Sequence, residues 1–99
     1  MPSYESSTIY IVYRRFSDFE WLLQKLQENE YYKGLIIPPL PEKKYFGNLD
    51  QNFIEKRKDE LENFLKVITG HQILKYDPQL KAFLTIGELD EYRSNPSAF

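Results

Sequence analysis

The sequence predicts a small α+β domain in which one strand is followed by helices. Residues 9–15 alternate along two faces and are rich in β-branched and aromatic side chains, a pattern typical of a strand. Three later segments carry apolar residues at helical spacing, and each segment has its own start signal. Because the chain has only 99 residues, it can bury one modest core and we expect one domain.

Composition excludes several classes of function. The 13 Lys and Arg residues against 15 Asp and Glu give a net charge of −2, which argues against generic nucleic-acid binding. The chain has no cysteine and its one histidine, His71, lacks a partner at useful spacing, so we expect a surface residue there, no metal and no cofactor. No nucleophile–base pair is found, and an enzyme is not expected. No apolar run approaches the roughly twenty residues that span a bilayer, so we expect a cytoplasmic protein with peripheral membrane contact.

The first helix is predicted over about residues 18–31. Ser17 is the expected N-cap, and Glu20 would complete a capping box with it. Apolar residues then follow at helical spacing, namely Phe19, Leu22, Leu23 and Leu26.

Two further helices are predicted after a proline-stiffened stretch, residues 38–41. One should begin near residues 50–52 and run to Thr69, with Gly70 as its stop. A shorter helix should open at Asp77-Pro78 and end before Gly87. Residues 88–99 are mostly polar, and we expect low order in this tail.

Basic residues flank the first helix and the proline stretch in a way that indicates one anion site. Arg14 and Arg15 precede Phe16, and Lys43 follows the prolines. An arginine fork fits phosphate oxygens, and a lysine on a stiff segment can approach the same anion from another side. Because strand neighbours face opposite sides, Arg14 and Arg15 cannot both point into one pocket. We choose Arg15 for this site and expect structural or rim contacts from Arg14. Arg57 begins a core-facing stripe and so needs a partner, for which a bound anion is one candidate.

Two other features have alternative interpretations. The Pro38–Pro41 segment contains a P-x-x-P pattern that an SH3 domain could bind, but between two packed helices an architectural role is favoured. Tyr45 and Phe46 could be core residues, although their position next to lysines and Gly47 favours a loop that inserts into a membrane.

Taken together, the Arg-Arg-Phe corner, the Pro-Pro-Leu-Pro-Glu-Lys turn and the pattern from Phe53 to Leu61 resemble a phox-homology (PX) domain of the sorting-nexin kind. The resemblance covers about residues 8–86. It implies a small antiparallel sheet packed on a helical subdomain with a Pro-rich loop, and binding of phosphoinositides, most often phosphatidylinositol 3-phosphate on endosomal membranes.

The resemblance also implies residue roles. Arg15 would bind the 3-phosphate, and Phe16 would pack against the inositol ring. Lys43 would meet the 1-phosphate, and Arg57 would hydrogen-bond the 4- and 5-hydroxyls.

The chain departs from the family pattern before residue 9. Two strands precede the arginine-bearing strand in the family, whereas only Met1 to Thr8 precede it here. We therefore expect residues 1–87 to be a PX-like domain that is N-terminally incomplete, with most of its sheet missing.

The main hypothesis from the sequence is a lipid-binding module that targets a sorting-nexin-like protein to endosomal membranes for protein trafficking, with protein partners of a trafficking coat. The alternative is a protein-interaction module that uses the Pro-rich loop or an exposed strand edge and has little lipid affinity.

Overall fold

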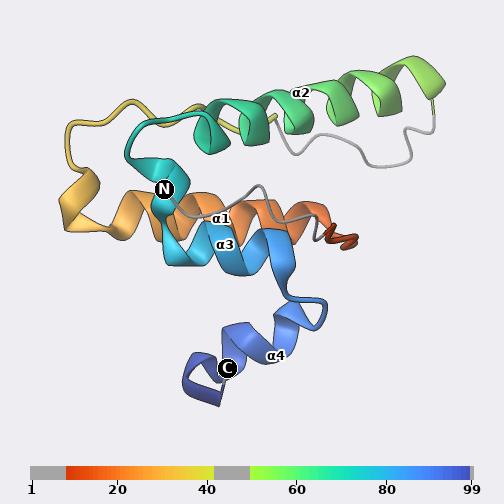
Figure 1. The fold of residues 1–99 in the computed structure, drawn as a ribbon. Helices are drawn as coiled ribbons and strands as arrows, with labels where there is room; N and C mark the ends of the chain where they lie inside the picture. Colours follow the sequence, from red (N-terminus) through yellow and green to blue (C-terminus); the bar gives the residue numbers. More distant parts are fainter. Residues whose placement is uncertain (1–8, 42–49, 99) are drawn as a thin grey trace.

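The computed structural model describes residues 9–41 and 50–98, and all regular elements in these ranges are helical. Helices α1 and α3 lie side by side, with α2 packed across one side of the pair and α4 on the other (Figure 1). None of the described helices is long and apolar enough to cross a membrane. The α-helices are α1 Phe16–Glu28, α2 Gln51–Thr69, α3 Pro78–Thr85 and α4 Leu89–Ser94, and the 3-10 turns are η1 Glu30–Tyr32, η2 Leu74–Tyr76 and η3 Pro96–Ala98.

The strand predicted at residues 9–15 is not found, because these residues have no regular secondary structure. Ile9, Ile11 and Tyr13 are 84%, 80% and 89% exposed. A strand needs a neighbouring strand to pair its backbone groups, and the described residues contain none. The sheet of the predicted α+β fold is therefore not confirmed, and only the helical part is seen.

Helix α1 begins two residues earlier than predicted, and its N-cap is Arg15 rather than Ser17. The Oδ2 atom of Asp18 accepts a hydrogen bond from the Arg15 backbone N–H at 2.7 Å, so Asp18 takes the capping-box role expected of Glu20. The helix also ends early, at Glu28. Asn29 accepts from the backbone N–H of Tyr31 at 2.9 Å and starts the separate turn η1.

Helices α2 and α3 begin and end close to the predicted residues because local caps define them. Asp50 accepts from the backbone N–H of Asn52 at 2.8 Å, and Gly70 is the C-cap of α2. At α3, the buried Asp77 accepts from the N–H groups of Gln79 and Leu80 at 2.8 and 3.0 Å.

Asp77 also ties α3 to the turn after α1. The Tyr32 hydroxyl donates to Asp77 Oδ2 at 2.6 Å. Burial, together with this hydrogen bond and the nearby negative charge, raises the pKa of Tyr32 to about 12. The contact therefore depends on a protonated tyrosine.

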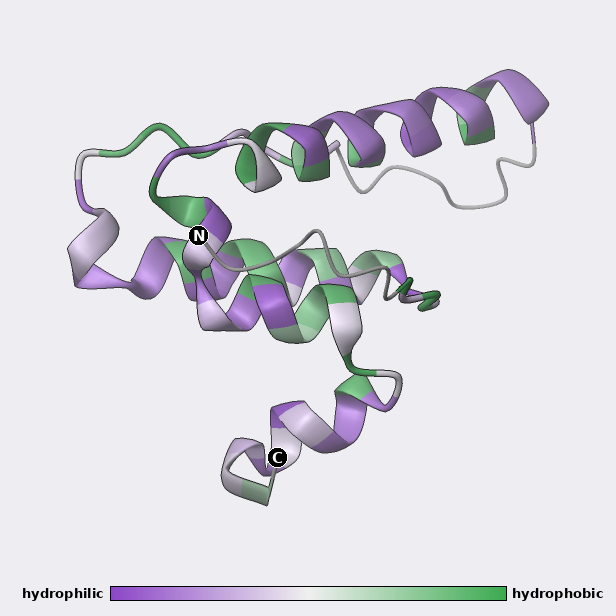
Figure 2. Ribbon diagram, viewed as in Figure 1, coloured by the Kyte–Doolittle hydropathy of each residue, from purple (hydrophilic) through white to green (hydrophobic). Residues whose placement is uncertain are grey.

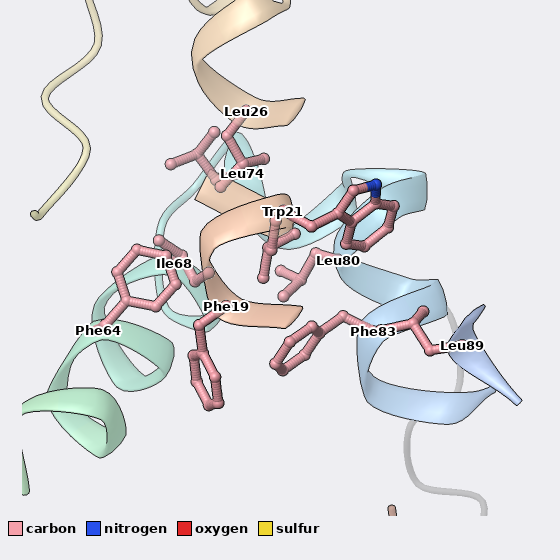
Figure 3. Close-up of a cluster of buried hydrophobic side chains, with 10 residues drawn as sticks. Phe19, Trp21, Leu26, Phe64, Ile68, Leu74, Leu80, Phe83 and Leu89 are labelled. Carbon is pink, nitrogen blue, oxygen red and sulfur yellow. The ribbon is translucent and has the colours of Figure 1, made fainter. Parts of the chain in front are cut away.

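The core lies where α1, α3 and the C-terminal half of α2 meet (Figure 3). Phe19 stands between Phe64 and Phe83, with ring centroids at 6.4 and 4.9 Å in edge-on arrangements. Leu40 of the proline segment packs against this cluster, in line with the architectural role expected for the segment. The buried hydrophobic side chains of this cluster are Phe19, Trp21, Leu22, Leu26, Phe64, Ile68, Leu74, Leu80, Phe83 and Leu89.

The tail is more ordered than expected, since residues 89–94 form α4. Leu89 is buried in the core cluster, and Tyr92 packs edge-on against Trp21 of α1 with ring centroids 6.2 Å apart. The Tyr92 hydroxyl donates to the side chain of Gln79 in α3 at 3.0 Å. Leu89 and Tyr92 thus help to dock this polar segment.

Candidate functional site

Arg14 makes structural contacts, as expected from the sequence. Its side chain is half-buried and donates from Nε to the carbonyl of Phe83 at 2.8 Å. It also donates to the carbonyls of Ala82 and Ile86, and its guanidinium lies 5.4 Å from the centre of the Phe83 ring. These are the carbonyls at the end of α3, where intrahelical partners run out and a cation is favoured. Arg14 therefore fixes the corner before α1 onto α3.

Arg15 points elsewhere and takes part in a network of charges. Its Nη2 atom lies 3.3 Å from Asp18 Oδ1 and 2.6 Å from Asp90 Oδ1 in α4. Asp18 is 3% exposed and also receives a hydrogen bond from Arg93 at 3.2 Å. Hydrogen bonding to Asp18 and the charges of both aspartates raise the pKa of Arg15, so it stays a cation. Burial raises the pKa of Asp18, but the hydrogen bonds from Arg15 and the charges of Arg15 and Arg93 lower it further. The pKa of Asp18 therefore lies below its ordinary value.

Phe16 and Arg57 meet although α1 and α2 are far apart in the sequence. The Arg57 guanidinium lies over the Phe16 ring at 3.9 Å from its centre, in cation–π geometry. Two of the four residues that the resemblance assigns to one pocket are thus in contact. Both side chains are half-buried.

Among the described residues, Arg15 and Arg57 line different cavities. Arg57 lines a groove of about 330 Å³, together with Arg14 and apolar residues of α2. Arg15 lines an open cavity of about 650 Å³ between α1 and α4, which also contains Trp21 and Asp90. The side chain of Arg15 is therefore turned toward α4.

The remaining predicted residues Lys43, Tyr45 and Phe46 lie outside the described residues. His71 is half-buried rather than a plain surface residue. Its Nδ1 atom accepts hydrogen bonds from the backbone N–H groups of Ile73 and Leu74 at 3.0 and 3.2 Å. Within residues 9–41 and 50–98, no three His, Cys, Asp or Glu side chains gather as metal ligands would.

Sequence reasoning missed three residues around Arg15, namely Asp18, Asp90 and Arg93. A weak signal for Asp18 existed, because an acid three residues after Arg15 can accept the Arg15 backbone N–H, although Ser17 with Glu20 is the better capping pair. No local pattern links Asp90 or Arg93 to Arg15, since they are about 75 residues away.

A family model and several known proteins match most of this chain. A family model for the PX domain matches residues 3–86. Sorting nexin-30 of Mus musculus is 39% identical over 88 residues, which cover 85% of this chain and 20% of that protein. The vacuolar protein sorting-associated protein vps5 of Schizosaccharomyces pombe is 43% identical over 79 residues, covering 80% of this chain and 13% of that protein.

Sorting nexin-1 of Homo sapiens is 36% identical over 99 residues, covering 90% of this chain and 19% of that protein. The chain thus spans about a fifth or less of the length of these relatives. The family model ends at residue 86, before α4 begins. With 84 residues inside that match, and with sorting nexins among its relatives, the chain belongs to the PX domain family.

Proposed function

We propose that this PX domain binds a phosphoinositide headgroup, that of phosphatidylinositol 3-phosphate in particular, and directs a sorting-nexin-like protein to endosomal membranes for protein trafficking. In this proposal Arg15 binds the 3-phosphate and Phe16 packs on the inositol ring. Lys43 contacts the 1-phosphate, and Arg57 donates to the 4- and 5-hydroxyls. Family membership and the identity of these four side chains support the proposal.

The observation that carries the proposal is the stack of Arg57 on Phe16 at 3.9 Å. An aromatic face beside an arginine fork suits a ligand that has both an apolar ring face and oxygen acceptors. An inositol ring that carries phosphate and hydroxyl groups is such a ligand. The stack brings α2 next to the start of α1, which supports a site to which both elements contribute.

The position of Arg15 supports a role in binding an anion. Arg15 is the N-cap of a 13-residue helix, so the positive end of the helix dipole lies beside its guanidinium. Its side chain is 63% exposed, so a phosphate can reach it from solvent.

Membrane residence would come from two signals. Charge-assisted hydrogen bonds to the headgroup would select the membrane. Burial of Tyr45 or Phe46 in the lipid interface would add up to roughly 1.5–3 kcal/mol each, and a lysine near an anionic surface about 1 kcal/mol. Recognition and insertion are then separable, so different variants should remove one without the other.

The first experiment compares variants in sedimentation with vesicles that contain phosphatidylinositol 3-phosphate. We expect Arg15→Gln and Arg57→Gln each to reduce binding at least about tenfold, because each removes a charged donor to the headgroup. Lys56→Gln is the matched control, since it removes one positive charge from the residue next to Arg57 on α2. Unchanged recruitment of Arg15→Gln, with its circular dichroism spectrum intact, would overturn the site assignment.

Lipid selectivity and insertion need their own measurements. Vesicles with other phosphoinositides test the preference for the 3-phosphate, and equal binding to all of them would contradict it. Replacing Tyr45 and Phe46 together by Ser should weaken vesicle binding and leave affinity for a soluble headgroup nearly unchanged. Equal losses in both assays would mean that these aromatics belong to the core.

A second candidate function is supported by the exposed residues before α1. Ile9, Ile11 and Tyr13 present apolar side chains at a spacing of two residues, and these side chains are highly exposed. A partner chain could pair with this segment or bind Pro38–Pro41. A pull-down with a candidate partner that survives Arg15→Gln and fails when residues 38–41 are replaced would favour this function.

A further inference from the structure

Helix α4 places a carboxylate on the arginine that the proposed function assigns to phosphate. The contact from Asp90 Oδ1 to Arg15 Nη2, at 2.6 Å, is shorter than the 3.3 Å contact from Asp18 Oδ1 to the same nitrogen. Arg93 joins the same network, with Nη1 at 3.2 Å from Asp18 and 3.9 Å from Asp90. Two arginines and two aspartates thus neutralise one another where α4 meets the start of α1.

The two aspartates are held very differently. Asp18 is buried and accepts a backbone N–H, so it remains beside Arg15 whatever else binds. Asp90 has a side chain that is 68% exposed and lies on a helix of only six residues. Exposed ion pairs contribute little to stability and exchange readily for a stronger partner. Asp90 is therefore the partner of Arg15 that can be displaced.

Other contacts keep α4 in place without Asp90. Leu89 is buried, Tyr92 packs on Trp21 and bonds to Gln79, and the Arg93 guanidinium lies 5.6 Å from the centre of the Trp21 ring. A change at Asp90 alone should leave the helix docked. The effect of the carboxylate can thus be measured separately from the effect of the helix.

We propose that α4 is a built-in competitor for the anion site, in which the Asp90 carboxylate occupies the side of Arg15 that a ligand phosphate would take. It holds the guanidinium in the cavity between α1 and α4, whereas Arg57 lines the separate groove beside α2. The inference rests on the proposed function, because only then is Arg15 a phosphate ligand. It deepens that function by giving it a regulating element outside the residues that the family model matches.

Competition of this kind tunes affinity and does not abolish it. A phosphate monoester carries roughly −1.5 to −2 charges against the single charge of a carboxylate, and it offers three acceptor oxygens. The headgroup therefore outcompetes Asp90, and the exchange lowers the apparent affinity by the strength of an exposed pair. That strength corresponds to about a two- to fivefold change in the dissociation constant.

The test compares Asp90→Asn with Glu91→Gln in the full chain. Each variant removes one negative charge from the first turn of α4, but the ion-pair partners of Arg15 among the described residues are Asp18 and Asp90. Calorimetric titration with soluble short-chain phosphatidylinositol 3-phosphate should show about two- to fivefold tighter binding for Asp90→Asn than for Glu91→Gln. Inorganic phosphate, titrated in parallel, shows whether the competition concerns any phosphate or only the lipid headgroup.

The outcomes separate this inference from the proposed function. If Arg15→Gln abolishes binding while Asp90→Asn and Glu91→Gln behave alike, the lipid site stands and the competitor role is wrong. If Arg15→Gln has no effect, both proposals are overturned. An amide NMR titration adds a second readout, because the ligand should shift the α4 resonances of the natural sequence and shift them less in Asp90→Asn. If the ligand does not shift the α4 resonances of the natural sequence, that result would also count against the competitor role.

Discussion

The two halves of α2 lie on the same helix and are packed very differently. In the C-terminal half, Phe64 and Ile68 are buried against α1 and the turn after α2. In the N-terminal half no residue is buried, and Ile54 is 44% exposed. Figure 2 shows the same contrast, since the N-terminal half of α2 is mainly hydrophilic and hydrophobic residues are more frequent toward its C-terminal end. Arg57 and its contact with Phe16 belong to this open half.

The contrast indicates that stability and recognition are located in different parts of the molecule. Burial of large apolar side chains is the main favourable term in folding, so the C-terminal half of α2 should hold the domain together. The open half contributes little burial and is available to a ligand. The predictions below test this division, starting with the largest expected effect.

A cavity in the packed half should be far more damaging than one in the open half. Phe64→Ala should lower the free energy of unfolding by about 3–5 kcal/mol, because Phe64 is 1% exposed and contacts Phe19. Ile54→Ala, on the open half of the same helix, should cost less than about 1 kcal/mol. Urea denaturation followed by circular dichroism measures both. Similar losses in the two variants would contradict the division.

Arg14 offers a sharper test, because it lines the groove beside the open half of α2 and yet bonds to α3. Arg14→Gln should lower the free energy of unfolding by about 1–3 kcal/mol, since charged donors to the last carbonyls of α3 are lost. Arg14→Lys keeps the charge and loses the fork of donors, so its free energy of unfolding should lie between those of the natural sequence and Arg14→Gln. If Arg14→Gln is as stable as the parent and loses only ligand binding, Arg14 belongs to recognition instead.

Acid should act on the packed side of α1 through Asp18. Its pKa is lower in the folded chain than in the unfolded chain, where the ordinary value is near 3.8. The resulting stabilisation is present above that value and is lost as the pH falls through the folded pKa. Asp18→Asn should cost about 1–2 kcal/mol at pH 7 as the cap is weakened. Asp18→Asn should also lose less stability below about pH 4 than the natural sequence, as measured by urea denaturation at several pH values. The same loss in both proteins would argue against this role of Asp18.

Alkali should act through Tyr32, and the effect is the smallest of the four. The pKa of Tyr32 is raised to about 12 from 10.0, so its contribution is present below pH 10 and is lost as the pH rises toward 12. Tyr32→Phe should cost about 0.5–1.5 kcal/mol at pH 7 by removing the bond to Asp77. Thermal unfolding at pH 8 and pH 11 tests this, and the variant should show the smaller difference between the two. An equal difference would place the alkaline sensitivity elsewhere.

Local signals in the sequence determined the helices whose ends are capped by nearby residues. Asp50, Gly70 and the pair Asp77-Pro78 define α2 and α3 without help from distant segments, because a cap bonds to backbone groups only two or three residues away. The structural contacts of Arg14 were also expected from the sequence, and they are seen at the end of α3. The residues that resemble the PX family also indicated the correct family from the sequence alone.

Tertiary structure alone decided the rest. Ser17 with Glu20 is the better local cap by sequence, because an arginine side chain has no acceptor for a backbone N–H. The helix nevertheless begins at Arg15, where Asp18 accepts the Arg15 backbone N–H and also pairs with Arg93 of α4. The predicted strand could not be judged from its own residues, because strand hydrogen bonds require a second segment. The contacts of Arg57 with Phe16 and of Asp90 with Arg15 join residues with no local relation, and only the packing of α2 and α4 brings them together.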